Sequence, residues 1–480
     1  MNTSLSLVDL AAVSPLLIVL FTAFIIIVIE SFAEEFSAKY AYLIATAGFA
    51  LGIFLTFMAP ASDNRLLTPW IRFDSLAKFF TIFFMSVGIG AAFLAASFFQ
   101  RFKATHGEFF FLLLSAVFGL ILIGAAADFL TLFLGIETLS ISLYILCGYM
   151  KKWEISHESS FKYFLMGSIA AAFLLYGIAL VYGALGTTRL DVLLIGYQNL
   201  TDRADKILFF SGIAMITLGL AFEAALVPFH LWAPDVYEGA STPVTAFMAV
   251  GTKAGAFAAF ARLFFEALPH FDPAWNQVID TLAYATLIYA NVVALRQLQL
   301  RRFFAYSGIS HAGFLMIPVV VGTPEALTSL AFYLTVYAIA TLGSFAVLAF
   351  LDHDSKGVML QDLHGLFRRS PWLAGMLAVC LLTLAGIPPT AGFLAKFYIF
   401  KVAFQAGYYS LVIVALLTTI LSAYYYLRII AVMLAEAPAA EEKLAKPWQA
   451  VLVGATSFVA ILVLSCYPAP LIDLLSLIQG

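Results

Sequence analysis

The chain has 480 residues, of which 63% are hydrophobic and only 11% are charged. A soluble globular domain is about half apolar and about a quarter charged, so these proportions exclude a soluble fold and indicate a protein that spans a bilayer. The formal net charge of −3 gives no reason to expect a nucleic-acid partner.

Apolar runs long enough to cross a membrane recur along the whole chain. Segment 1–30 has no positive region before its apolar run and no small-residue cleavage site after it, so we interpret it as a retained span. A spanning helix needs about 20 mainly apolar residues. The sequence therefore predicts an all-α polytopic membrane protein, a single transmembrane domain over 1–480. About fourteen spans are expected, at 11–30, 40–59, 74–99, 109–126, 128–149, 161–183, 207–227, 243–266, 277–295, 302–321, 326–350, 372–404 (broken), 408–433 and 449–470.

Lysine and arginine gather in alternate loops between these spans. The richer set is Lys39, Arg101, Lys103, Lys151, Lys152, Arg296, Arg301, Arg302, Lys356, Arg368, Arg369, Lys443 and Lys446. The poorer set is Arg65, Arg72, Arg189, Arg203, Lys206 and Lys401. The richer side is expected to be cytoplasmic, and an even number of spans then leaves both termini on the outer side.

Four charges lie well inside predicted spans: Glu137, Glu223, Lys253 and Lys396. None has an opposite charge three or four residues away in its own span. A charge at the bilayer centre costs roughly 2.5–3.5 kcal/mol, so each is a candidate functional residue. Static ion pairs between helices, or side chains that reach the interface from a misplaced helix end, remain the alternatives.

Prolines interrupt two of the charged spans. Pro228 follows Glu223 by five residues, and Pro388–Pro389 precede Lys396. Inside a membrane, such breaks persist where protein or a water-filled cavity satisfies the freed backbone groups. Broken helices at similar places in two halves of a chain are typical of transport proteins. Ordinary proline kinks are the alternative.

Two histidines accompany these charges. His230 can share a helix face with Glu223 if the helix continues through Pro228, and His311 lies inside its own span. Each can be a proton relay or a hydrogen-bonded core residue. Gly251 and Gly255 flank Lys253 at a spacing that lets another helix approach closely.

The sequence gives no sign of a metal site or a disulfide. No histidine pair has metal-ligand spacing, and Cys147, Cys380 and Cys466 lie in apolar runs without a CxxC motif. The buried set of Glu, Lys, His and Tyr is chemistry that suits protons better than sugars, amino acids or metal ions.

Five stretches resemble a known family in their order and spacing: LVPFHLWAPDVYEGASTPVTAFMAVGTKAG, RRFFAYSGISHAGFLM, DLHGLFRRSP, LAGIPPTAGFLAKFYIF and SAYYYLRII. They resemble the antiporter-like membrane subunits of bacterial proton-pumping NADH–quinone oxidoreductase (respiratory complex I), which are related to Mrp-type cation/proton antiporters. WAPDVYEG is similar to the N type of these subunits. The resemblance extends from about Glu108 to Arg428.

The resemblance implies two inverted five-helix repeats with broken helices, at approximately 109–266 and 277–433, flanked by 1–100 and 449–480. It also implies a proton path along the membrane midplane. Glu137, Lys253 and Lys396 match the family's charged residues on the fifth, eighth and twelfth helices. Lys162 matches a position on the sixth helix that is commonly basic.

Glu223 departs from the family pattern, which usually has lysine there. Two neighbouring carboxylates favour a single shared proton rather than an ion pair. Our hypothesis is that Glu223 carries a proton as a neutral acid coupled to Glu137 or to Lys162. The alternative is that the channel has lost one coupling element at this position.

The resemblance also implies the cellular setting. The chain would be a proton-translocating subunit in a bacterial inner membrane, in contact with lipid and with other membrane-arm subunits. It would bind no cofactor or metal itself, while the complex would use FMN, iron–sulfur clusters, NADH and a quinone. Two other functions remain open: an Mrp-type cation/proton antiporter subunit, and a mainly structural membrane-arm subunit.

Overall fold

A computed structural model describes residues 6–60, 64, 66–102, 106–269, 273–352, 354–436 and 447–479. In these ranges the helices are α1 Leu7–Ala12, α2 Ser14–Phe32, α3 Glu34–Met58, α4 Ser75–Phe102, α5 Gly107–Ala125, α6 Phe129–Cys147, α7 Glu154–Leu185, α8 Leu193–Asn199, α9 Arg203–Glu223, α10 Trp232–Gly239, α11 Thr242–Ala261, α12 Pro273–Ala294, α13 Leu300–Val321, α14 Pro324–Leu351, α15 Leu366–Arg369, α16 Pro371–Ala385, α17 Ala391–Gln405, α18 Tyr409–Leu434, α19 Trp448–Cys466 and α20 Ala469–Ser476. The segments η1 Leu190–Val192, η2 Arg262–Ala267, η3 Leu360–Leu363 and η4 Leu477–Gln479 are short 3-10 or π turns, and these ranges hold isolated bridges but no strand.

The predicted spans agree closely with these helices. Thirteen helices in the described ranges are long and apolar enough to cross a membrane. The expected broken span 372–404 is present as α16 and α17, which are separated by residues 386–390. The all-α polytopic prediction is therefore confirmed. Arg65, Lys103, Lys443 and Lys446, which entered the orientation argument, lie outside the described residues.

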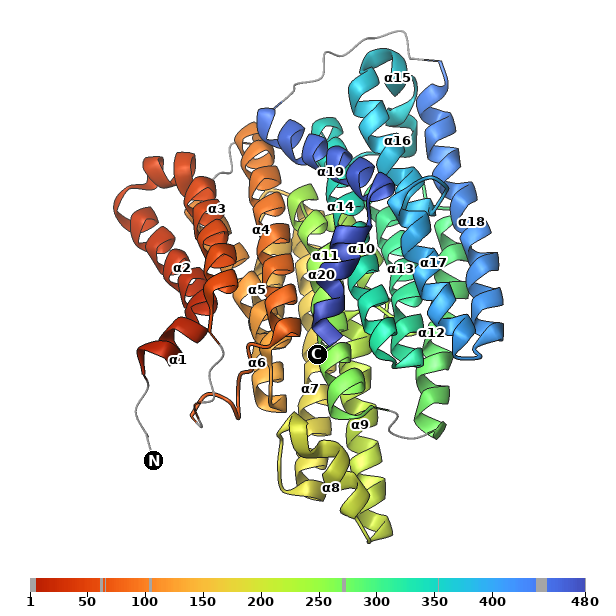
Figure 1. Ribbon diagram of the computed structural model, residues 1–480. Helices are drawn as coiled ribbons and strands as arrows, with labels where there is room; N and C mark the ends of the chain where they lie inside the picture. Colours follow the sequence, from red (N-terminus) through yellow and green to blue (C-terminus); the bar gives the residue numbers. More distant parts are fainter. Residues whose placement is uncertain are drawn as a thin grey trace.

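The bundle has a buried centre between exposed flanks. In Figure 1 the pair α2 and α3 forms one edge and α12 and α18 lie toward the other. Helix α11 is buried along its whole length, α13 is buried except at Arg302, and α14 is nearly all buried. The small residues of α11 permit this burial: a Cβ on Gly255 would lie 2.6 Å from Leu120 Cδ2 of α5. The central helices are the ones that carry Lys253 and His311.

Polar side chains of the protein satisfy the backbone at both helix breaks. Helix α9 ends at Glu223, and the indole Nε1 of Trp232 donates to the Phe222 carbonyl over 2.9 Å. Because α9 stops there, His230 lies on the following turn and not on the same helix as Glu223. At the second break, the Ala391 amide donates to Ser465 Oγ over 2.8 Å. Such partners are what a break inside a membrane requires.

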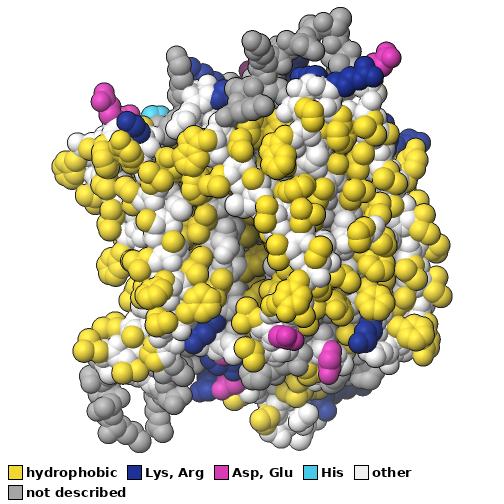
Figure 2. Space-filling model, turned by 45° about the horizontal axis from the view of Figure 1, so that its top comes forward, with side chains coloured by type: hydrophobic (Ala, Val, Ile, Leu, Met, Phe, Trp, Pro, Cys, Tyr) yellow, Lys and Arg dark blue, Asp and Glu magenta, His cyan; other side chains and the backbone are white. Residues whose placement is uncertain are grey.

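The largest difference from the predicted boundaries is at α7. This helix begins at Glu154, whereas the apolar run predicted a start at 161. Its first two turns are polar, and a hydropathy criterion stops where polar residues begin even though the helix continues. Figure 2 shows the outer surface that results, a broad band of hydrophobic side chains with charged side chains near its upper and lower rims.

Candidate functional site

A half-buried and a buried carboxylate lie near each other where α6 faces the end of α9; we call Glu137 and Glu223 the carboxylate pair. Glu223 is 6% exposed, and its Oε1 accepts a hydrogen bond from Ser140 Oγ over 3.1 Å. Ser140 lies three residues after Glu137 on α6, so both side chains occupy one face of that helix. Glu137 Oε1 and Glu223 Oε2 are buried without a hydrogen-bond partner among the described residues. Each acid therefore has an oxygen that can accept a proton without losing a hydrogen bond.

Lys162 lies in a different, partly exposed charge network. Its Nζ is 2.7 Å from Glu158 and 3.0 Å from Asp235, and the side chain is 40% exposed. Arg302 Nη1 binds Asp235 and Glu238, each over 2.8 Å. Burial favours the neutral acid at Asp235, but hydrogen bonds from Lys162 and Arg302 outweigh it and hold the pKa below its usual range. These partners make Lys162 one member of a network of fixed charges.

A row of aromatic rings runs from the carboxylate pair toward Lys253. Tyr144, four residues after Ser140 on α6, contacts Tyr163 of α7 with ring centroids 4.8 Å apart. Tyr163 stacks on Trp232 at 4.6 Å, and Trp232 contacts Tyr237 at 6.2 Å. Sequence analysis did not single out these rings, although the WAPDVYEG stretch contains two of them.

Lys253 ends this row in the most buried part of the bundle. The side chain is 0% exposed, and its Nζ donates to Tyr237 Oη over 3.0 Å. Across the interface lies Gly308 of α13, where a Cβ would be 3.1 Å from Nζ. No carboxylate of the described residues lies within 4.0 Å of Nζ. The static ion pair considered as an alternative is therefore not found for Lys253 in this part of the chain.

His311 is the centre of a hydrogen-bonded cluster. Its Nδ1 is 2.7 Å from Tyr333 Oη of α14, and its Nε2 is 3.1 Å from Tyr426 Oη of α18. Tyr426 also hydrogen-bonds Ser307, one turn before His311 on α13. A neutral imidazole has one donor and one acceptor nitrogen, and hydroxyls can take either role. The cluster can thus exchange a proton between its members by switching these roles.

Lys396 lies directly against the second helix break. Its Nζ donates to the Ala385 carbonyl over 3.0 Å and lies 3.4 Å from Ser422 Oγ and 4.5 Å from the centre of the Phe314 ring. The side chain is 3% exposed. Lys396 and His311 both line a cavity of about 10 Å³, close to the smallest volume that holds one water molecule. The break thus supplies the lysine with a carbonyl that a continuous helix would have used itself.

His230 lies away from this row of groups. Its ring packs against Tyr289 of α12, with centroids 4.7 Å apart. Both ring nitrogens of His230 are buried without a hydrogen-bond partner among the described residues. The hydrogen-bonded core alternative is therefore not found for His230 in this part of the chain, and its role as a relay stays a prediction.

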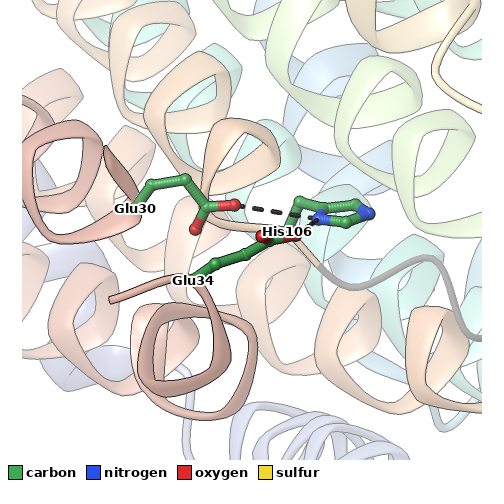
Figure 3. Close-up of side chains that lie close together, drawn as sticks. All are labelled: Glu30, Glu34 and His106. Atoms are coloured by element: carbon green, nitrogen blue, oxygen red, sulfur yellow. Dashed lines mark ion pairs between the residues drawn. The ribbon is translucent and has the colours of Figure 1, made fainter. Parts of the chain in front are cut away.

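Three side chains with metal-binding atoms meet at the edge of the bundle (Figure 3). His106 Nδ1 is 3.7 Å from both Glu30 Oε1 and Glu34 Oε1. The Gly107 amide also donates to Glu30 over 2.9 Å. Glu34 and His106 are largely solvent-exposed. These contacts connect the turn between α2 and α3 to the start of α5, and exposed acidic groups of this kind are common without a metal.

Comparison with known proteins identifies the family. Residues 126–422 match the family described as NADH:quinone oxidoreductase/Mrp antiporter, TM. NADH-quinone oxidoreductase subunit N of Protochlamydia amoebophila (strain UWE25) is 72% identical over 477 residues, which cover 99% of each chain. A chain of respiratory complex I from Thermus thermophilus, solved with bound aureothin, is 30% identical with a TM-score of 0.81, covering 96% of this chain and 98% of that one.

The fold is shared more widely than the sequence. A chain of the Mrp complex from Dietzia sp. DQ12-45-1b superposes with a TM-score of 0.84 over 98% of this chain, at 18% identity. That likeness concerns the fold alone. The family match and the identity to subunit N both include the helices that carry the buried acids and lysines. The chain therefore belongs to the NADH:quinone oxidoreductase/Mrp antiporter family of membrane subunits, in its subunit N branch.

Proposed function

We propose that protons cross this subunit of NADH–quinone oxidoreductase by way of the carboxylate pair, Lys253, the His311 cluster and Lys396. One observation carries the proposal: both lysines are buried, and the described contacts of each are with neutral oxygens rather than carboxylates. A buried ammonium without a counter-ion costs several kcal/mol, so a change in its surroundings can make it release its proton. A lysine in a fixed ion pair has no such freedom.

The route has a physical order along the bundle. Tyr237 and Gly308 connect the surroundings of Lys253 to α13, and the His311 cluster continues to the cavity beside Lys396. A proton that arrives at one group repels the proton on the next, so transfer can proceed by successive charge shifts. The redox groups act elsewhere in the complex, and this subunit responds to their turnover through charge and hydration at the carboxylate pair.

The carboxylate pair would hold one proton between two acids. Support comes from their orphan oxygens and from Ser140, which binds one acid and follows the other on α6. Glu223→Gln keeps the shape and an acceptor for Ser140 but cannot ionise. We expect it to reduce NADH–quinone turnover and proton pumping together, and normal pumping by an assembled variant would mean that the route bypasses α9.

The arrangement of helices also supports two repeats. The segments 109–266 and 277–433 would each contribute five helices, and in each the fourth is the broken one, α9 with α10 and α16 with α17. The second helix of each carries a titratable residue, the half-buried Glu137 in α6 and the buried His311 in α13. We infer an inverted pair of repeats, with both chain termini on the outer face of a bacterial inner membrane because the opposite loops carry more lysine and arginine.

The decisive experiment compares two lysines of one helix. Lys396→Met removes a buried charge while keeping most of the side-chain volume, and Lys401→Met makes the same change at an exposed site five residues along α17. Native membrane vesicles with each variant would be assayed for NADH–quinone turnover and proton uptake, with assembly checked on native gels. We expect both rates to fall in assembled Lys396→Met complex and to persist in Lys401→Met.

The same experiment separates the alternative functions. If assembled Lys396→Met complex keeps both rates, the lysine is structural and the subunit is a membrane spacer. The antiporter alternative is disfavoured by the 72% identity to subunit N over nearly the whole chain, against 18% for the Mrp chain.

A further inference from the structure

A long apolar cleft lies between the N-terminal and C-terminal helices, apart from the proton route. Its volume is about 790 Å³. Helix α4 forms one wall, and α14, α19 and α20 form the others. The hollow near the centre of the surface in Figure 2 lies between these helices. Nearly all of its lining side chains are hydrophobic or small, so water molecules inside it would find few hydrogen-bond partners.

The dimensions of the cleft suit extended hydrocarbon chains. Its α4 wall runs from Ser75 to Phe93, which at 1.5 Å per residue is a length of ~27 Å. This is most of the ~30 Å hydrocarbon core of a bilayer.

One cation marks the end of the cleft near the start of α4. Lys78 is the only charged side chain among the residues that line it in the described ranges. Its Nζ donates to the Ala59 carbonyl over 2.9 Å, and no carboxylate of the described residues lies within 4.0 Å. An ammonium has three donors, so Lys78 can bind a further anionic oxygen. Its place in the first turn of α4 puts it near a membrane surface, at the level of headgroups.

We propose that this cleft is a binding site for an anionic phospholipid of the surrounding bilayer. The acyl chains would lie along α4 and against α19, and the phosphate would contact Lys78. The lipid would fill the space between α4 and the C-terminal helices that line the cleft. The proposal does not depend on the proton route.

The test uses the whole purified complex carrying this chain or a variant of it. The complex is reconstituted into phosphatidylcholine vesicles that contain a small share of phosphatidylglycerol with a photoactivatable acyl chain. After irradiation, cross-linked peptides are mapped by mass spectrometry, and a second set uses phosphatidylcholine with the same photoactivatable chain. We expect cross-links on α4 and α19, with phosphatidylglycerol preferred.

Two matched pairs of variants probe the two halves of the site. Ser86 lines the cleft and bonds only to the Ile82 carbonyl of its own helix, so Ser86→Phe fills the cleft at little other cost. Ser168 on α7 is equally exposed and bonds to its own helix in the same way, so Ser168→Phe is the control. We expect Ser86→Phe alone to abolish most cross-links to α4 and α19.

The headgroup contact is tested at Lys78. Lys78→Gln should reduce the preference for phosphatidylglycerol by about fivefold, the contribution of one lysine near a membrane surface, while Lys401→Gln leaves it unchanged. Absence of cross-links on α4 and α19 in the unmodified chain would mean that a neighbouring subunit covers the cleft, and would overturn the proposal. If cross-links persist in Ser86→Phe, the lipid contacts only the outer surface of these helices and does not enter the cleft. If the preference for phosphatidylglycerol is unchanged in Lys78→Gln, Lys78 does not bind the headgroup.

Discussion

The glycine of the proposed proton route that tolerates a side chain least is Gly386, the residue that follows α16. Its φ is +76°, in the left-handed region where side chains other than glycine are strained. A Cβ at this position would lie 2.7 Å from Lys396 Cδ and 3.2 Å from Lys396 Cε. Gly386→Ala therefore combines backbone strain with displacement of the lysine.

A second glycine separates these two effects. Gly186 ends α7 with φ +69°, and a Cβ there would meet nothing within 4 Å. Gly186→Ala should cost about 1 kcal/mol from backbone strain alone. Gly386→Ala should cost that strain plus roughly 0.5–1.5 kcal/mol for forcing Lys396 off its rotamer, or roughly 1.5–2.5 kcal/mol in all.

The functional consequence should differ more than the stability. Displaced Lys396 loses its alignment with the Ala385 carbonyl and the cavity it shares with His311. We expect assembled Gly386→Ala complex to lose turnover and proton pumping, and Gly186→Ala complex to keep both. Thermal unfolding of the purified complexes gives the stability difference, and vesicle assays give the rates. Equal rates in the two variants would contradict this prediction, because displacement of Lys396 would then have no effect on turnover or pumping beyond that of backbone strain.

Tyr426→Phe removes the hydroxyl that contacts both His311 and Ser307, so it should slow proton pumping in vesicles. Tyr424 on the same helix is 63% exposed, and the control variant Tyr424→Phe should pump at the normal rate. Arg262→Met leaves the partly exposed Asp74 carboxylate with only Arg72 as an ion-pair partner and should destabilise the complex by about 1–3 kcal/mol in thermal unfolding. Burial opposes ionisation of Asp74, but hydrogen bonds from Arg262 outweigh it and lower the Asp74 pKa. That stabilisation is present above the unfolded pKa near 4 and is lost as the pH falls through the lower folded value. Melting temperatures at decreasing pH should therefore show a smaller acid-induced drop in Asp74→Asn.

The sequence was sufficient for the spans and the second break because both are local properties. An apolar run of about 20 residues predicts a spanning helix. The two prolines before Lys396 predict a helix break, whichever helices pack around it. The start of α7 was missed for the same reason, since its first turns are polar and only helix hydrogen bonds reveal them. The face shared by His230 and Glu223 was a conditional expectation, and its condition fails because α9 ends at Glu223.

The hydrogen-bond partners of the buried titratable residues could not be predicted from the sequence. Tyr426 lies 115 residues from His311, and Ser140 lies 83 residues from Glu223. Periodicity identifies which face of a helix is buried but not which other helix it meets. Lys162 illustrates the limit: its basic character was predicted, but its contact with Asp235 depends on how α10 folds back against α7.

The type of basic residue differs between the ion-pair network at the end of α11 and the proposed proton route. Arg262 is 1% exposed and binds Asp74 and Glu266, a set of fixed charges at one end of α11. Arginine keeps its proton in proteins, so such a network holds a constant charge. Lysine can lose its proton when buried, and the described partners of Lys253 and Lys396 are neutral oxygens and aromatic rings, with no carboxylate among them. Arg262 with its two acids therefore fits a fixed charge, and the two buried lysines without acids fit the transferable charges of the proposed route.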